Sequence, residues 1–197
     1  MIDIIYVTGN KQKIDVANKI LGPLGFNIIQ NKIDCPEIQA NTNKEVAIYS
    51  AKYASDFLKA NVLKNDSGLV IPSLNGFPSA YTRYVEETLK EDGILALMKD
   101  KTDRYCYFID EFAYCEYGSD PIVFSVITEG VISTEARGFD GVGYDKIFIP
   151  KGYDKTLAEI PYETRHLIWN DQAYKDLAEY LNKKRSNRTD MKKFYTK

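Results

Sequence analysis

The 197-residue sequence contains a single histidine, His166, and only three cysteines. One histidine excludes a metal centre built from several histidines and argues against a serine–histidine catalytic triad. Cys35, Cys106 and Cys115 are odd in number and lack the short spacings of a zinc site, so we expect them to be reduced thiols. Chemistry in this protein must therefore rest on carboxylates, lysines and backbone groups.

Long apolar runs are also missing from the chain. No stretch approaches the ~20 apolar residues that a membrane helix needs, and no apolar N-terminal segment resembles a secretion signal. We therefore expect a cytoplasmic protein that does not associate with membranes.

Positive and negative residues are nearly equal in number, which gives a formal net charge of −2, but they are unevenly distributed along the chain. The last residues form a basic tail with Asp190 as its one acid and with Lys183, Lys184, Arg185, Arg188, Lys192, Lys193 and Lys197. This tail, residues 183–197, has no apolar stripe, so we expect it to be mobile. Loose binding of RNA or DNA to the tail is the less favoured alternative.

A polar turn follows the first expected strand. Residues 1–7 are apolar and β-branched, which predicts a buried strand, and apolar residues then recur at helical spacing from Ile14 until Gly22-Pro23. A helix start offers free backbone N–H groups and the positive end of the helix dipole, both of which favour an anion. The pattern fits either a phosphate-binding turn or a simple helix cap, and its polar residues are Thr8, Asn10, Lys11 and Lys13.

The middle of the chain predicts a helix followed by a carboxylate at a strand end. Thr42 and Glu45 fit a capping box, and an apolar stripe that includes Tyr49 and Phe57 continues the helix to about residue 59. Residues 65–68 then separate two short apolar runs, which predicts a turn and places Asp66 at a strand end. Such carboxylates often border the cleft of an α/β fold, although Asp also favours turns through its own local hydrogen bonds.

The second half predicts more strands than helices. Residues 81–98 suggest two helical pieces interrupted near Asp92-Gly93, and the β-rich runs 105–117 and 122–132 predict a hairpin. The glycine-rich segment 137–145 is a candidate ligand loop. Asn170 is expected to cap a last amphipathic helix whose inward face is Ala173, Tyr174, Leu177, Ala178 and Leu181.

Five segments occur in an order that resembles one family: Thr8–Lys13, Cys35–Gln39, Asn65–Leu69, Gly76–Pro78 and Gly141–Asp145. Together they are similar to the inosine/xanthosine triphosphate pyrophosphatases, from about residue 4 to residue 181. The resemblance implies an elongated mixed α/β fold with a long curved sheet and two lobes around a central cleft, in one domain over residues 1–182. It also implies a homodimer that uses Mg²⁺ to hydrolyse a nucleoside triphosphate to the monophosphate and pyrophosphate.

The resemblance further implies roles for individual residues. It assigns Glu37 and Asp66 to Mg²⁺, with Asp66 also activating the attacking water. It assigns the triphosphate to Thr8, Asn10 and Lys13, with Lys11 beside them, and contacts with the rest of the substrate to Ser67, Tyr144 and Asp145. The assignment is physically reasonable, because Mg²⁺ prefers oxygen ligands and keeps several waters.

The chain departs from the family pattern mainly where the base is read. Arg165 replaces a lysine, Trp169-Asn170-Asp171 replaces Ser-His-Arg, Val142 replaces a stacking phenylalanine, and Asn65 replaces the first of two adjacent acids. We therefore predict that Arg165, Asn170 and Asp171 contact the base and that base specificity is altered. Alternatively, Asn170 is a helix cap and Asp171 suits a first helical turn. The competing function is a catalytically weak or inactive nucleotide-binding protein that acts as a sensor or partner.

Overall fold

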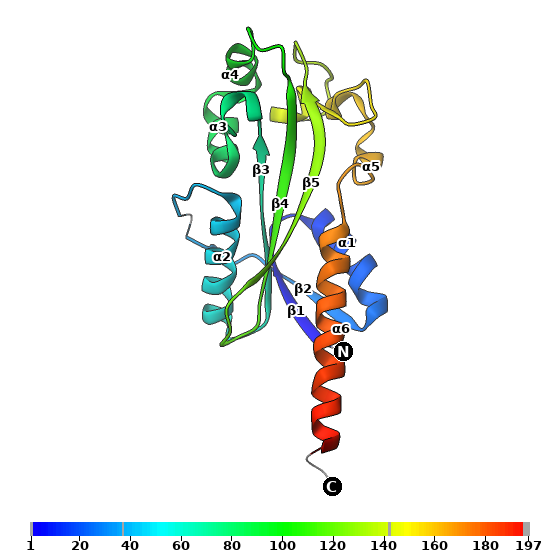
Figure 1. Ribbon diagram of the computed structural model, residues 1–197. Coiled ribbons are helices and arrows are strands. Elements are labelled where there is room, and N and C mark those ends of the chain that lie inside the picture. The colour runs from blue at the N-terminus through cyan, green and yellow to red at the C-terminus, as the bar shows by residue number, and fades with distance from the viewer. Residues whose placement is uncertain (1, 37, 142, 195–197) are drawn as a thin grey trace.

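The computed structural model describes residues 2–36, 38–141 and 143–194. One six-stranded mixed sheet runs through it in the order β2-β1-β3-β4-β5-β6. β1 pairs in parallel with β2 and β3, and all other pairs are antiparallel. The molecule is elongated along the curved strands, as Figure 1 shows, which confirms the predicted fold class. The strands are β1 Ile2–Val7, β2 Phe26–Asn31, β3 Val62–Val70, β4 Tyr105–Cys115, β5 Ile122–Ile132 and β6 Phe148–Pro150.

Helices cover the sheet on both sides (Figure 1). α2 (Asn43–Leu58) packs on one face of β3 and β4, while α1 (Lys11–Leu21) and α6 (Gln172–Phe194) pack together on the other face. α3 (Thr82–Thr88) and α4 (Lys90–Leu97) flank the outer end of β3, and α5 (Tyr162–Arg165) is a single turn. Within the described residues, no helix is long and apolar enough to cross a membrane.

The two largest hydrophobic cores share the long strands. Along β3, Leu63 belongs to the core under α1 and α6, whereas Leu69 belongs to the core near α3, α4 and β6. Along β4, Phe112 packs in the first core and Phe108 against the second. Polar residues occupy the strands between the cores, so the sheet has a polar waist between two apolar lobes.

Several local predictions are confirmed. The hairpin of β4 and β5 is present, and the expected first strand and first helix are present as β1 and α1. Thr42 and Glu45 form the capping box at the start of α2: Thr42 Oγ1 accepts from Glu45 N and Glu45 Oε2 accepts from Thr42 N. These features depend on residues close in sequence, which is why the sequence predicts them well.

The predicted turn at residues 65–68 is wrong, because β3 is continuous through it. Asn65, Asp66 and Ser67 pair in register with Phe112, Glu111 and Asp110 of β4, so the polar residues stay in the sheet with partners on both faces. The helix break predicted near Asp92-Gly93 is also misplaced: it falls at Leu89, and Lys90 takes a positive φ of 58°.

The predicted apolar face of α2 is correct only in part. Ala54 is buried as expected, but Tyr49 is 40% exposed and Phe57 is 65% exposed, and the helix also buries Ala47 and Ala51. Small side chains allow α2 to lie close to the sheet, which leaves the larger aromatic rings outside. α6 continues twelve residues beyond Asn182, because no Gly or Pro interrupts the basic segment and Lys and Arg favour helix. In that segment, Lys184 Nζ lies 2.6 Å from Glu116 Oε2.

Candidate active site

The turn after β1 is organised by Asn10. Its Oδ1 accepts from the backbone N–H groups of Gln12 (2.9 Å) and Lys13 (3.4 Å), and its own N–H donates to Thr8 Oγ1 (3.1 Å). The helix-cap interpretation is therefore observed. The cap uses the amide oxygen, and the Nδ2 group of this exposed residue is still a donor that an anion at the helix start could accept. Lys11 is exposed beside it.

Lys13 reaches from α1 to β3. Its Nζ donates to Ser67 Oγ over 3.3 Å, so the structure brings together two residues that the family resemblance assigns to the substrate. Burial lowers the pKa of Lys13, while the carboxylates of Asp110 and Asp66 raise it. Burial is the larger effect, so the pKa is lowered overall, and the two carboxylates offset part of that lowering.

Asp66 projects from β3 toward α2. Asn43, which is 3% exposed in the first turn of α2, donates from Nδ2 to Asp66 Oδ2 over 2.7 Å. Gly68 permits this approach, because a Cβ there would lie 2.5 Å from the Asn43 side chain and 2.6 Å from the Ser79 carbonyl oxygen. Burial raises the pKa of Asp66 from 3.8 to about 6, against the lowering effects of Asn43, Lys64 and Lys13. A carboxylate with this pKa can gain or lose a proton near neutral pH.

The structure describes only one of the two predicted metal ligands, Asp66. Glu37 lies outside the described residues, as does Val142. Among the residues that the structure describes, no three His, Cys, Asp or Glu side chains gather into a metal site. Asp66 remains the carboxylate that could hold a cation, and one or two carboxylates are sufficient when substrate phosphates supply further oxygen ligands.

Three candidates for base contact gather around the glycine-rich loop. Tyr144 is 3% exposed, and its hydroxyl donates to the Thr82 carbonyl over 3.0 Å. Arg165 is 7% exposed; its Nε donates to the Ile160 carbonyl over 2.9 Å, and its NH1 lies 3.5 Å from Asp145 Oδ2. These contacts fix the loop from inside, so the structure shows a packing role for Tyr144 and Arg165.

The other two candidates lie where α6 begins. Asn170 Oδ1 accepts from Gln172 N over 3.0 Å, so Asn170 caps the helix, and its Nδ2 donates to the Ile127 carbonyl over 3.3 Å. Asp171 forms an exposed ion pair with Lys175 at 2.7 Å. The local interpretation of both residues is thus observed, and contact with a base stays a prediction.

Two residues that contact the candidate site were not predicted from the sequence, Asn43 and Asp110. Asn43 has no sequence signal, because its role depends on where α2 packs. Asp110 has a sequence signal, because two adjacent acids, Asp110 and Glu111, interrupt an apolar strand. Adjacent strand residues point to opposite faces, so the two acids lie on opposite faces of the sheet. With helices on both faces of the sheet, each acid needs a polar partner, and Ser67 and Ser125 supply them.

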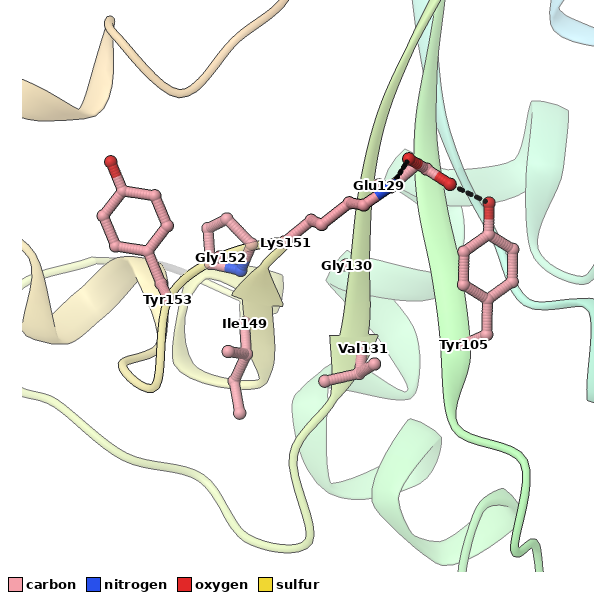
Figure 2. Close-up of a pocket in the computed structure, with 9 residues that line it drawn as sticks. Tyr105, Glu129, Gly130, Val131, Ile149, Lys151, Gly152 and Tyr153 are labelled. Atoms are coloured by element: carbon pink, nitrogen blue, oxygen red, sulfur yellow. Dashed lines mark hydrogen bonds and ion pairs between the residues drawn. The ribbon is translucent and has the colours of Figure 1, made fainter.

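Two cavities occur among the described residues, one beside the sheet and one beside α2. One, of about 430 Å³, lies where β4, β5 and β6 end; Figure 2 shows Glu129 there accepting from Tyr105 and pairing with Lys151. It contains none of the predicted site residues. The other, of about 400 Å³, is lined by residues 38–41, Glu45 and Tyr81 at the start of α2, whose Asn43 holds Asp66.

Comparison with known proteins gives consistent relatives. The chain is 40% identical to a dITP/XTP pyrophosphatase of Methanopyrus kandleri over 162 residues, 82% of this chain and 86% of the relative. It is 38% identical to a dITP/XTP pyrophosphatase of Thermococcus kodakarensis over 177 residues, 89% and 95% of the two chains. Solved Ham1 structures from Coxiella burnetii (28% identity, TM-score 0.79, covering 93% of this chain and 100% of that one) and Staphylococcus aureus (27%, 0.77, 92% and 99%) share the fold.

A family model described as the Ham1 family matches residues 4–180. This range agrees with the span over which the sequence motifs resemble the triphosphate pyrophosphatases. The resemblance is therefore confirmed, and the chain belongs to the Ham1 family.

Proposed function

We propose that this protein hydrolyses a nucleoside triphosphate with a non-standard purine base, releasing the nucleoside monophosphate and pyrophosphate. The observation that carries the proposal is the arrangement at the middle of β3. Asp66 and Ser67 are adjacent residues of this strand: Asp66 supplies a carboxylate with a pKa of about 6, and Ser67 holds the ammonium of Lys13 from α1. The names of the relatives, dITP/XTP pyrophosphatases, support the same reaction.

The residues of the site divide the work of the reaction. Asp66 takes a proton from the water that attacks the α-phosphorus, and the bond from that phosphorus to the pyrophosphate oxygen breaks. A base with a pKa near neutrality is suited to this step. Lys13 and the N-terminus of α1 offset the negative charge on the phosphate oxygens.

Mg²⁺ fits the donor set as a cofactor. Asp66 is a partly buried carboxylate whose charged form is disfavoured by burial, and a divalent cation would reverse that penalty. Asp66 and Glu37 would hold the ion, which when bound neutralises phosphate charge and lowers the pKa of a coordinated water. Glu37→Gln should then raise the Mg²⁺ concentration needed for half-maximal activity.

The base pocket is proposed to involve Asn170 and Asp171. An ionised carboxylate only accepts hydrogen bonds, so Asp171 favours an exocyclic amine over a carbonyl oxygen. This predicts a weak or reversed preference for inosine over adenosine or guanosine triphosphate. To contact a base, Asp171 must give up its ion pair with Lys175, which costs little at an exposed site.

A panel of nucleoside triphosphates assayed for pyrophosphate with Mg²⁺ tests the proposal. We expect release from at least one purine triphosphate and almost none from the Asp66→Asn variant. Binding of nucleotide without release from any substrate would contradict the proposal and favour the sensor or partner alternative. A strong preference for inosine or xanthosine triphosphate would contradict only the base assignment. The homodimer and the cytoplasmic location stay predictions.

A further inference from the structure

A hydrogen-bond network crosses the polar waist between the two cores, and it converges on Asp110. Ser67 and Asp110 face each other in register across β3 and β4, and Ser67 Oγ donates to Asp110 Oδ1. Asn65, two residues from Ser67 and on the same face, donates from Nδ2 to Asp110 Oδ1 (3.4 Å) and Ser67 Oγ (3.2 Å). Lys13 Nζ donates to the same Ser67 oxygen.

A second branch enters the network from buried tyrosines. Tyr6, fully buried, donates its hydroxyl proton to Asn65 Oδ1 over 3.1 Å. The single hydroxyl proton of Tyr174 has two acceptors within reach, the Tyr6 hydroxyl oxygen at 3.2 Å and the Lys13 carbonyl oxygen at 3.4 Å. The donors that reach Asp110 directly are Ser67 Oγ and Asn65 Nδ2, and the carboxylate accepts from both.

The direction of these hydrogen bonds determines whether Ser67 acts as donor or acceptor toward Lys13. A hydroxyl has one proton, and Ser67 gives it to Asp110, so the lone pairs of Oγ are left to face the ammonium. The Lys13 ammonium has three donors and uses one of them on Ser67. Among the described residues, no carboxylate lies within 4.0 Å of Lys13 Nζ, so its other donors are not taken by a direct ion pair.

Placing the carboxylate one hydroxyl away from the lysine has a physical advantage. A direct ion pair would compete with an incoming phosphate for the ammonium. With Ser67 between them, Asp110 still favours the charged form of Lys13, which burial disfavours. The ammonium keeps donors available for a phosphate. Because Asn65 is uncharged, Asp110 supplies the negative charge of this face of the network.

We propose that Asp110 is a positioning residue for the triphosphate, acting through Ser67 to hold the Lys13 ammonium charged and directed at the phosphates. The proposal rests on the proposed function. It makes a prediction opposite in sign to simple electrostatics. Removal of a nearby carboxylate should ordinarily strengthen the binding of an anion, whereas here removal of Asp110 weakens it.

The test measures binding of inorganic tripolyphosphate by calorimetry, together with kcat and KM, for Asp110→Asn. We expect tripolyphosphate to bind on the order of tenfold more weakly and KM to rise by a similar factor, the loss of roughly one charge-assisted bond. The matched control is Glu129→Gln, which removes a β5 carboxylate that pairs with Lys151 and, within the described part of the chain, has no contact with the network, so both values should be unchanged. Tighter binding by Asp110→Asn, or unchanged binding, overturns the proposal.

Two further variants separate positioning from a structural or metal-binding role. In a Lys13→Ala background, Asp110→Asn should cause no additional loss; losses that multiply would mean that the two residues act independently. The exchange Asn65→Asp with Asp110→Asn keeps one carboxylate and one amide on the same face, so it should restore binding even where the single variant folds poorly. A folded exchange variant without restored binding overturns the proposal, as does a rise in the Mg²⁺ requirement of Asp110→Asn with unchanged tripolyphosphate binding.

The tripolyphosphate binding measurement tests this inference separately from the proposed hydrolysis. If the wild-type protein binds tripolyphosphate in an Asp110-dependent way but releases no pyrophosphate from any nucleotide, the positioning role stands and the hydrolytic function fails. If the protein hydrolyses nucleotides and Asp110→Asn matches it in binding and KM, the function stands and the positioning role fails.

Discussion

Asp66→Asn should stabilise the fold while it abolishes activity. In the folded protein, burial raises the pKa of Asp66 from 3.8 to about 6, so the ionised carboxylate is held at a cost. The difference between these values corresponds to at most about 3 kcal/mol of stability above pH 7. Asn is nearly isosteric and neutral, and its amide oxygen can still accept from Asn43. The melting temperature of the variant should therefore rise, by up to roughly 10 °C.

The pH dependence of this effect has a definite sign. Because the folded state binds the Asp66 proton more tightly than the unfolded state, the cost is absent below about pH 4. It grows as the pH rises from 3.8 to about 6 and is constant above that range. Unfolding of the variant and the wild type should thus coincide at pH 3.5 and diverge by pH 7, measured in chelator so that no cation offsets the charge.

Asp56→Asn provides the control for charge alone, since Asp56 is an exposed carboxylate paired with Lys52. The melting temperature of Asp56→Asn should show no comparable gain.

The catalytic consequence is a loss of about 10²-fold or more in kcat for Asp66→Asn, typical of a missing general base. Greater stability with little activity would be a stability–function trade-off. A variant less stable than the wild type at pH 8 would refute the burial argument, and near wild-type turnover would refute the catalytic role.

Three other substitutions test the surroundings of the site. Lys13→Ala should weaken every triphosphate by a similar 1.5–3 kcal/mol, roughly the worth of a charge-assisted bond, seen as KM across the nucleotide panel; a loss confined to one base would contradict this. Gly68→Ala should cost about 1–3 kcal/mol in urea unfolding and reduce activity because its Cβ meets Asn43, whereas Gly22→Ala, with open space and φ −55°, should be neutral within about 0.5 kcal/mol. Thr42→Ala should lower the unfolding free energy by about 1 kcal/mol through loss of the α2 cap, and an unchanged value would mean that the cap is replaced by solvent.

The elements that the sequence predicted correctly are those specified by neighbouring residues. The capping box at Thr42, the cap at Asn10 and the β4–β5 hairpin each need a few positions along the chain. The continuity of β3 could not be predicted in this way. Polar residues 65–68 resemble a turn until β4, more than forty residues later, supplies partners for them.

The candidate site likewise contains residues that the sequence identified and residues that depend on tertiary packing. Lys13, Ser67 and Asp66 were identified through the family motifs, and the structure brings them together at the waist. Asn43 has no sequence signal, because its contact follows from helix packing; the acidic pair Asp110-Glu111 is visible in the sequence, but the partner of Asp110 follows from strand register. Side-chain size misled the prediction for α2, where the distance to the sheet, rather than apolar character, decided which face is buried.

The position of the site follows from how the long strands are shared. Each core needs apolar residues at its own end of β3 and β4, so the middle of the strands belongs to neither core and is free to carry charge. Alternation then sends Asp66 toward α2 and Ser67 toward α1, which separates the proton-accepting carboxylate from the lysine site while keeping them one residue apart. Such buried polar groups are costly unless they have hydrogen-bond partners. The network that ends at Asp110 meets that requirement on one face and Asn43 meets it on the other, so the same hydrogen bonds that make a charged waist tolerable also orient the groups that act on the phosphates.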